Sequence, residues 1–401
     1  VDAGTRSVTL SQSYSGTTSN YTITGQINKP SATITAKTVT LRASKVYDGT
    51  LDLSGAVTAE TGVGSETLTY SNAIANDVHV ATLHKYIDDI TLVNATDGSG
   101  GLASNYVLPT LNNSNAPVTI TAKILTPTIT NTGVTKVYDG TTSSSITPTY
   151  LFSGLVSGDT NASLTNSGQI YNSAHVLDAA TITISGLEIA SITGSNSSAA
   201  TDYVLDASSK TVEAAISKKA VSATVSAADK VYNGNTAAIV TITYSDLVGS
   251  ETLTTASSSA TFSDQNAEIN KTVTVNSITL GDGDNGGLAA NYSVTTGQTT
   301  LATISKAPLS VTGMNTTVTY NASAQNSEAA TILGTQGSDS FVISGYATAT
   351  NYSAVAYADD LSVTSAAINN YDITYTNGSL TIIKAPLSVT GMNTTVTYNA
   401  S

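Results

Sequence analysis

The sequence contains no cysteine and no tryptophan, and only 3 of its 401 residues are phenylalanine. Without cysteine the chain has neither disulfides nor thiol chemistry, so packing and hydrogen bonds alone must hold its fold together. Charged residues make up only 11% of the chain, and 28 acidic against 15 basic residues give a formal net charge of -13. This balance argues against nucleic-acid partners and against attachment to an anionic membrane through a basic patch.

Long apolar runs are also missing from the sequence. No uninterrupted stretch approaches the ~20 apolar residues of a membrane-spanning helix, so we expect no direct insertion into a membrane. The first residues, VDAGTRSVTLSQ, lack the basic start and the apolar middle of a signal peptide. We expect any such segment to have been removed or to lie outside this sequence.

Motifs for catalysis are lacking as well. The sequence has no GxSxG elbow, and a Ser-His-acid triad would have to draw on only 3 histidines. Glycine-rich runs follow no strand that opens a helix, which argues against phosphate-binding loops. One acid per module, such as Glu66 or Asp339, is more typical of architecture than of the carboxylate pair of a glycosidase. We therefore expect no catalytic site and no enzymatic activity.

What the sequence does have is repetition. The phrase KVYDGT occupies residues 45–50 and 136–141, and it returns as KVYNGN at 230–235. Residues 385–401 repeat residues 307–323 letter for letter. Similar closing phrases recur at domain-sized intervals and end at Lys37, Lys123, Lys218, Lys306 and Lys384. The chain is thus predicted to hold the end of a preceding module (1–37), modules 1 to 4 (38–123, 124–218, 219–306 and 307–384), and the start of a further module (385–401).

Each predicted module has a β pattern, because apolar and polar residues alternate in short runs rich in Thr, Val, Ile and Tyr. In module 1 the expected strands are residues 38–43, 66–70, 77–84, 88–93, 105–110 and 116–122. A helical interpretation of residues 208–220 is overruled by the same slot in the other modules, which is plainly a strand. The prediction is an all-β tandem array of small antiparallel β-sandwich (Ig-like) modules that forms an extended, semi-rigid rod, since few residues remain at the joints.

The repeated phrase has the composition of a turn. Val46 and Tyr47 are expected to end a strand, and Asp48-Gly49 supplies a pair that adopts positive φ at little cost. Module 4 has TVTYNAS in this slot, which keeps Tyr320 and Asn321 but has lost the Lys and the Gly. A catalytic phrase would not survive that loss, whereas a turn could.

These residues resemble two related families, the YDG and MBG domains. Modules 1 to 3 resemble YDG domains through Lys45–Gly49 and its repeats, a Gly-then-acid step further along, and SNY, TDY or ANY before the final hairpin. Module 4 resembles an MBG domain through APLSVT (307–312) and NNYDITYTNGSLTI (369–382). Such modules occur in tandem in large secreted bacterial adhesins, including those similar to filamentous haemagglutinin. The resemblance implies an extracellular stalk on a bacterial cell surface that supports adhesion or biofilm, without enzymatic activity.

A recurring Lys, acid and Asn/Asp trio offers an alternative role as an intramolecular isopeptide crosslink. Such a crosslink needs a buried neutral amine, a carbonyl and a proton-shuttling carboxyl group. In the plainer interpretation the Lys lies along the sheet, the acid caps or turns, and the Asn or Asp shapes a loop. The residues are Lys45, Glu66 and Asn105 in module 1, Lys136, Asp159 and Asp202 in module 2, and Lys230, Glu251 and Asn291 in module 3.

Two groups of residues have the chemistry of metal ligands. The loop GDGDNGG (281–287) brings Asp282, Asp284 and Asn285 close together, and these oxygens suit calcium, although the loop fades in other modules and is equally typical of a solvated turn. His79 and His84 share one segment, but their spacing places them on opposite faces of a strand, so surface positions are expected rather than zinc ligation.

Two further functions stay open beside the stalk. Host, matrix or neighbouring-cell surfaces are the expected partners, and glycans could stack on exposed tyrosines such as Tyr346, Tyr352 and Tyr357, unless these pack across strands. Alternatively, exposed strand edges could drive self-association, so that the chain would be a subunit of an extracellular filament or sheath.

Overall fold

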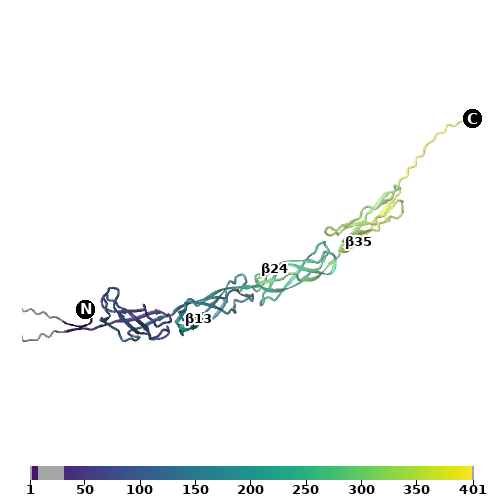
Figure 1. Cartoon of the computed structure of the whole chain (residues 1–401). Helices are drawn as coiled ribbons and strands as arrows, with labels where there is room; N and C mark the ends of the chain where they lie inside the picture. The colour runs from purple at the N-terminus through teal and green to yellow at the C-terminus, as the bar shows by residue number, and fades with distance from the viewer. Residues whose placement is uncertain (1, 8–30, 400–401) are drawn as a thin grey trace, which may run out of the picture. The chain divides into compact units, whose positions relative to one another are not determined.

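The computed structural model describes residues 2–7 and 31–399, coloured along the chain in Figure 1. Within these residues β-strands are joined by loops and short 3-10 turns, and no helix is long and apolar enough to cross a membrane. The predicted all-β class is therefore confirmed. By their contacts the residues form two compact units, drawn from Val1–Lys136, Thr141–Ala174 and Asp178–Ile216 (unit 1) and from Val137–Gly140, His175–Leu177 and Ser217–Ser401 (unit 2).

Unit 1 begins with a two-stranded ribbon of β1 (Gly4–Ser7) and β2 (Ser31–Ile34). In module 1 the strands form one sheet in the order β5-β4-β9 and two ribbons, β6-β7 and β3-β8. The strands of module 1 are β3 (Lys37–Thr38), β4 (Thr40–Val46), β5 (Val57–Glu60), β6 (Thr69–Ala75), β7 (Ile87–Val93), β8 (Tyr106–Val107) and β9 (Val118–Thr121).

Module 2 builds two larger sheets, β12-β10-β17 and β11-β18-β15-β14, and the ribbon β13-β16, in which β13 is labelled in Figure 1. Its strands are β10 (Lys123–Ile129), β11 (Val134–Val137), β12 (Tyr150–Ser153), β13 (Asp159–Thr165), β14 (Gly168–Tyr171), β15 (Thr181–Ser185), β16 (Glu188–Gly194), β17 (Tyr203–Leu205) and β18 (Ser209–Ser217). Three of its residue stretches, 137–140, 175–177 and 217, pack in unit 2.

Unit 2 contains modules 3 and 4. Module 3 has sheets β22-β19-β25 and β20-β26-β24-β23-β21, and its strands are β19 (Lys219–Ala227), β20 (Lys230–Val231), β21 (Ala237–Ala238), β22 (Val240–Ser245), β23 (Leu253–Phe262), β24 (Glu268–Asp282), β25 (Tyr292–Val294) and β26 (Thr299–Ser305). Module 4 has sheets β30-β27-β35 and β28-β36-β33 and the ribbons β29-β32 and β31-β34. Its strands are β27 (Ala307–Thr312), β28 (Asn315–Thr319), β29 (Gln325–Asn326), β30 (Thr331–Leu333), β31 (Val342–Ser344), β32 (Thr348–Ala349), β33 (Tyr357–Ala358), β34 (Ser362–Thr364), β35 (Tyr371–Thr376) and β36 (Ser379–Ile383).

The opening strand of each module pairs in parallel with strands near the module's end. In module 4, β27 pairs with β35 from Ala307↔Tyr371 onward, and β28 pairs with β36. The pairs β4 with β9, β10 with β17 and β19 with β25 are likewise parallel, whereas the hairpins between them are antiparallel. These parallel pairs add to the predicted antiparallel ones, because alternation reveals the buried face of a strand but not the direction of its neighbour.

The apolar core continues across a module boundary within each unit. In unit 1 one cluster joins Leu41 and Ile87 of module 1 to Leu125 of module 2. In unit 2 another cluster joins Val273 of module 3 to Leu309 of module 4. A module of this size has a thin core, so sharing apolar surface with its neighbour adds to its stability.

Two local predictions had different outcomes. Residues 209–217 form strand β18, which confirms the strand interpretation over the helical one. The strand predicted over residues 77–84 is wrong, because this segment is a loop between β6 and β7 in which His84 has a φ of 59°. In this loop His79 and Val80 contact Asp202 of the next module.

A buried carboxylate ties module 4 together. Asp359 is only 3% exposed; its Oδ1 accepts hydrogen bonds from Ser327 Oγ (2.6 Å) and Ala347 N (2.8 Å), and its Oδ2 accepts one from Gly378 N (3.1 Å).

We predict that Asp359→Ala destabilises module 4 by about 3 kcal/mol or more, because three buried donors lose their acceptor. Hydrogen exchange of the β36 amides measures this loss. The neighbouring, exposed Asp360→Ala is the control, and equal exchange in both variants would contradict the prediction.

Candidate functional site

The repeated phrase forms a turn at the end of a strand, which we call the tyrosine turn (residues 47–50, 138–141, 232–235 and 320–323). In module 1, β4 ends at Val46, and Gly49 has a φ of 77°, as the sequence predicted. Asp48 Oδ1 accepts a hydrogen bond from Thr50 N at 2.9 Å, so the acid side chain closes the turn. Gly140 and Gly234 have φ values of 76° and 78°, so the turn geometry recurs in modules 2 and 3.

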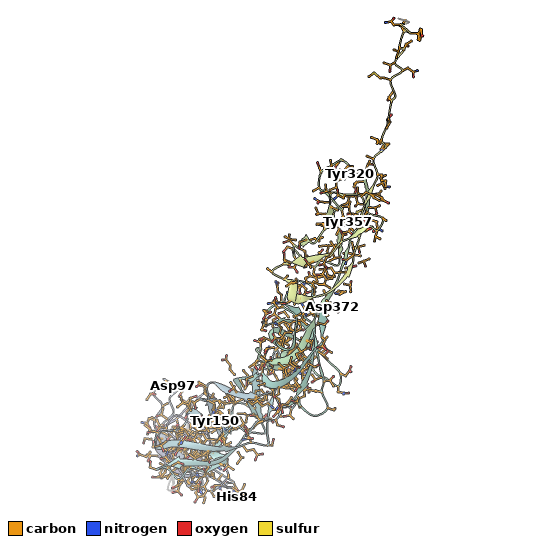
Figure 2. All side chains as sticks on the ribbon, turned by 90° about the vertical axis from the view of Figure 1, so that its right-hand side faces the viewer. His84, Asp97, Tyr150, Tyr320, Tyr357 and Asp372 are labelled. Carbon is orange, nitrogen blue, oxygen red and sulfur yellow. The ribbon has the colours of Figure 1, made fainter. Side chains whose placement is uncertain are left out.

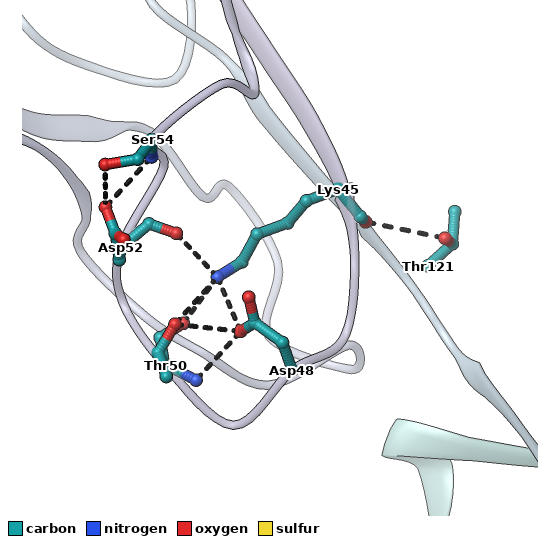
Figure 3. Close-up of polar contacts among 6 residues, drawn as sticks. All are labelled: Lys45, Asp48, Thr50, Asp52, Ser54 and Thr121. Carbon is teal, nitrogen blue, oxygen red and sulfur yellow. Dashed lines mark hydrogen bonds and ion pairs between the residues drawn. The ribbon is translucent and has the colours of Figure 1, made fainter. Parts of the chain in front are cut away.

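The lysine of the phrase holds the turn from inside. Lys45 Nζ donates hydrogen bonds to Asp48 Oδ1 (2.7 Å) and to the backbone oxygens of Thr50 (2.7 Å) and Asp52 (2.8 Å), as Figure 3 shows. In module 3, Lys230 Nζ contacts Asn235 O (2.7 Å) and Ala237 O (3.0 Å). Lys136 makes the same pair of backbone contacts in module 2, with Thr141 O and Ser143 O. The lysine therefore satisfies turn carbonyls and fixes the position of the tyrosine beside it.

The tyrosine of each of these turns is buried against the module that follows. Tyr47, Tyr138 and Tyr232 are 1%, 2% and 1% exposed. Each meets the tyrosine that follows the 3-10 turn of the next module in an edge-to-face arrangement, a favoured geometry for aromatic pairs. The ring centroids lie 5.6 Å apart for Tyr47 and Tyr203, 5.4 Å for Tyr138 and Tyr292, and 5.5 Å for Tyr232 and Tyr371.

A carboxylate joins the two tyrosines of each pair. Glu251 accepts hydrogen bonds from Tyr138 Oη (2.7 Å) and Tyr292 Oη (2.6 Å), one on each carboxylate oxygen. Asp339 Oδ2 accepts from both Tyr232 Oη (3.0 Å) and Tyr371 Oη (2.7 Å). A carboxylate held by hydroxyl donors forms charge-assisted bonds, which are among the stronger hydrogen bonds in proteins.

The joint between modules 1 and 2 adds a bridging hydroxyl to this scheme. Tyr203 Oη donates to Asp159 Oδ2 at 2.5 Å, whereas Tyr47 Oη reaches only Ser198 Oγ at 2.6 Å. Ser198 Oγ in turn donates to Asp159 Oδ2 at 2.7 Å. Ser198 therefore relays the contact between Tyr47 and Asp159, whereas Glu251 and Asp339 contact both of their tyrosines directly.

The carboxylate stands on a loop of constant form, which we call the acidic loop (residues 63–66, 156–159, 248–251 and 336–339). The backbone N–H of the acid donates to the carbonyl three residues earlier in every module, as in Glu251 N to Val248 O at 3.0 Å. The tyrosine hydroxyl also accepts a hydrogen bond from the first N–H of the loop, as in Val248 N to Tyr292 Oη at 3.0 Å. One side chain thus links the acidic loop, the closing hairpin and the preceding module.

A second polar contact accompanies each tyrosine pair. The side chain of the Asn or Asp that precedes the tyrosine accepts a backbone N–H from a loop of the preceding module. These bonds are Val80 N to Asp202 Oδ1 (2.7 Å), Val176 N to Asn291 Oδ1 (3.0 Å) and Ala267 N to Asn370 Oδ1 (2.9 Å), and Ala3 N to Asn105 Oδ1 (2.6 Å) has the same form. Each joint therefore has two separate attachment points.

The structure does not bring the trio predicted for an isopeptide crosslink together. Lys45 is held in its own turn, Glu66 Oε2 accepts a hydrogen bond from Tyr106 Oη (2.6 Å), and Asn105 contacts Asp2 and Ala3. In modules 2 and 3 the equivalent residues divide in the same way. The regular spacing of the trio reflects three different roles in the joints: the lysine shapes the turn, the acid receives tyrosines, and the Asn or Asp forms the second contact.

The predicted calcium residues form a hydrogen-bonded loop. Asp282 Oδ1 accepts from Ala289 N (2.8 Å), Asp284 O accepts from Thr252 N (3.1 Å), and Asn285 Nδ2 donates to Ser250 O (3.0 Å). Across the described ranges, 2–7 and 31–399, no group of three His, Cys, Asp or Glu residues could hold a metal ion.

The two histidines, His79 and His84, make different contacts. His79 Nδ1 lies 2.8 Å from Asp202 Oδ2 at the joint, which corrects its predicted surface role, whereas His84 Nδ1 lies 3.1 Å from Asn113 Nδ2. His79 was missed because its partner is 123 residues away in sequence.

The tyrosines considered for glycan stacking have unequal settings. Tyr346 packs with the cluster around Val311, and Tyr357, labelled in Figure 2, packs with the cluster around Leu380. Tyr352 is 48% exposed, and Lys384 Nζ lies 4.8 Å from the centre of its ring. Of the three, Tyr352 alone therefore keeps a largely open ring.

Comparison with known families identifies the family of two segments in the middle of the chain. Residues 121–211 and 217–301 each match the family model of the YDG domain. The chain therefore contains two YDG domains in tandem, which correspond to modules 2 and 3. The matches end before module 4, and the resemblance of module 1 to a YDG domain and of module 4 to an MBG domain stays a prediction. No curated protein matches the chain.

Burial and the nearby carboxylate make the joint tyrosines hard to ionise. Burial first, and then the hydrogen bond to Glu251, raise the pKa of Tyr292 to about 12 from an ordinary value of 10.0. Burial and Asp339 raise the pKa of Tyr371 to about 12 in the same way. A tyrosinate beside a carboxylate would replace a hydrogen bond with repulsion between two negative charges.

We predict that the joints of unit 2 weaken as the pH rises from 10 to about 12. The native state keeps these phenolic protons in that window while the unfolded chain loses them, so stability is complete below pH 10 and declines above it. Tyrosinate absorbance combined with hydrogen exchange follows both events. The double variant Tyr292→Phe/Tyr371→Phe should flatten the response, and an unchanged pH profile in that variant would count against the assignment.

Loss of a single joint hydroxyl should open one joint. We predict that Tyr138→Phe weakens the contact with Glu251 by about 1.5–3 kcal/mol, the range for a hydrogen bond to a charged group. Hydrogen exchange at residues 248–251 reports the loss. The control is Tyr244→Phe, which removes a hydroxyl that lies 2.7 Å from the neutral Thr255 Oγ1 and should cost about 1 kcal/mol. If the control variant exchanged faster at 248–251 than Tyr138→Phe, the carboxylate bridge would not be the main contact.

Proposed function

We propose that the chain is a non-catalytic repeat region, the stalk of an extracellular bacterial surface adhesin or fibre, which projects a binding region found elsewhere and so supports adhesion or biofilm. The observation that carries this proposal is the joint in which a carboxylate links two tyrosines, directly at two module boundaries and through Ser198 at a third. The residues that recur most clearly from module to module therefore hold neighbouring modules together.

The burial of these residues supports a structural role over a binding role. A repeated ligand site has to keep its side chains accessible, whereas Tyr47, Tyr138 and Tyr232 are at most 2% exposed. A stalk needs joints that resist bending, and two attachment points with a shared apolar core supply that resistance. The tandem YDG domains agree with a region built from repeats.

Distance measurements between paired spin labels test the stiffness of one joint. The chain has no cysteine, so Asp88→Cys and Glu188→Cys, two exposed positions in unit 1, can be labelled alone. We expect a narrow distance distribution, and a broad one after Tyr47→Ala removes the buried ring. A broad distribution in the chain with Tyr47 intact would contradict the proposed stalk.

Binding and assembly assays separate the stalk from its alternatives. A passive stalk is expected to show no binding to glycan arrays or matrix proteins and to give single particles in electron micrographs, with chelator and with calcium alike. Glycan binding that Tyr352→Ala abolishes would instead assign a glycan-binding module. Filaments or bundles would instead indicate a self-assembling subunit.

A further inference from the structure

The tyrosine turns approach the next module so closely that their third residue is constrained. Gly140 faces Val248, and a Cβ atom on this glycine would lie 2.9 Å from Val248 Cγ1. On Gly49 it would lie 3.2 Å from Val156 Cγ2 and 3.1 Å from Asn196 Nδ2. Both valines occupy the first position of the acidic loop. Where that position is valine, the turn of the preceding module has little room for a side chain: a Cβ atom would overlap Val248 and would crowd Val156.

The joint between modules 3 and 4 leaves more room. Here Gly234 faces Gly337, and a Cβ atom on Gly234 would lie 3.6 Å from Gly337 Cα, which is an ordinary van der Waals contact. The acidic loop of module 4 begins with Gln336-Gly337, so no branched side chain meets the turn. This loop can therefore accept a turn residue that carries a Cβ atom.

The turn of module 4 carries such a residue. Ala322 has a φ of 67°, close to the glycine values, and Ser323 N donates to Asn321 Oδ1 at 2.9 Å as in module 1. A non-glycine residue with this φ is strained. Tyr320 is 39% exposed, whereas its three buried counterparts are covered by a following module, and Figure 2 shows it on module 4. The turn is thus formed but uncovered among the described residues.

We propose that the third residue of the tyrosine turn and the residue facing it in the acidic loop form a recognition pair that decides which module can follow which. The turn of module 4 then fits a module whose acidic loop begins with Gln-Gly, as at Gln336-Gly337, and it excludes a module whose acidic loop begins with valine, as at Val248. The sequence agrees, because residues 385–399 repeat residues 307–321 and so begin a module of the fourth type. This pairing rule would hold whether or not the array serves as a stalk.

A matched pair of substitutions tests the rule within the chain. Gly140→Ala and Gly234→Ala introduce the same strain, since their φ values are 76° and 78°. Hydrogen exchange should rise about tenfold more at residues 248–251 in the first variant than at 336–339 in the second, because only Gly140→Ala overpacks its joint. Adding Val248→Ala to Gly140→Ala should remove this excess. Equal rises in the two single variants, or no rescue, would overturn the proposal.

Extension of the chain tests the partner of module 4 directly. Residues 1–384 are followed either by a second copy of 307–384 or by a second copy of 219–306, and hydroxyl-radical footprinting measures the accessibility of Tyr320. We expect protection of Tyr320 in the first chain and not in the second, and recovery of protection in the second when Ala322→Gly is added. Protection of Tyr320 in both parent chains, or in neither, would overturn the pairing rule.

Discussion

The structure depends on a half-buried carboxylate that two modules must satisfy together. A carboxylate removed from water is costly unless hydrogen-bond donors surround it, and in the joints of unit 2 one donor hydroxyl comes from each side of a module boundary. Neither module can supply both donors. Separation would leave Glu251 or Asp339 with one of its two tyrosine hydroxyl partners and would expose a tyrosine ring. Both the electrostatic and the apolar effect therefore disfavour separation. This coupling explains why the sequence repeats a short phrase with such regularity.

Each residue of the repeated phrase helps to place the tyrosine ring at the joint. Lysine donates hydrogen bonds to the turn carbonyls, and the acid or amide closes the turn. Glycine adopts the positive φ and allows the close approach to the next acidic loop. The joints also show that geometry is kept when residues change, because Asp159 with Ser198 does the work that Glu251 does alone. The hydrogen-bonded link between neighbouring modules is therefore kept although the residues that form it differ.

Much of the fold could be predicted from the sequence, and for physical reasons. Comparison with the same slot in the other modules identified strand β18, and the glycine of the repeated phrase correctly indicated positive φ. The misses share one cause. Parallel pairing of β27 with β35 and the loop at 77–84 are set by partners far away in sequence, about which a local pattern carries no information. The positions of the modules along the chain came from repetition, which is a property of the whole sequence and not of any segment.

The residues of the candidate site were found from the sequence in part, but their partners were not. Spacing singled out the lysine, acid and Asn/Asp of each module, and all of them act at joints, but the sequence offered no way to see that the acid pairs with a tyrosine of the preceding module. Tyr138 and Glu251 are 113 residues apart. Within one module the trio raised a crosslink among its own members as an alternative, because spacing along the chain does not tell which module supplies the partner of a residue. In a tandem array the correct frame is the boundary, where a residue's nearest partners belong to the neighbouring copy. Constant spacing in every repeat then signals a contact between repeats as readily as a site within one.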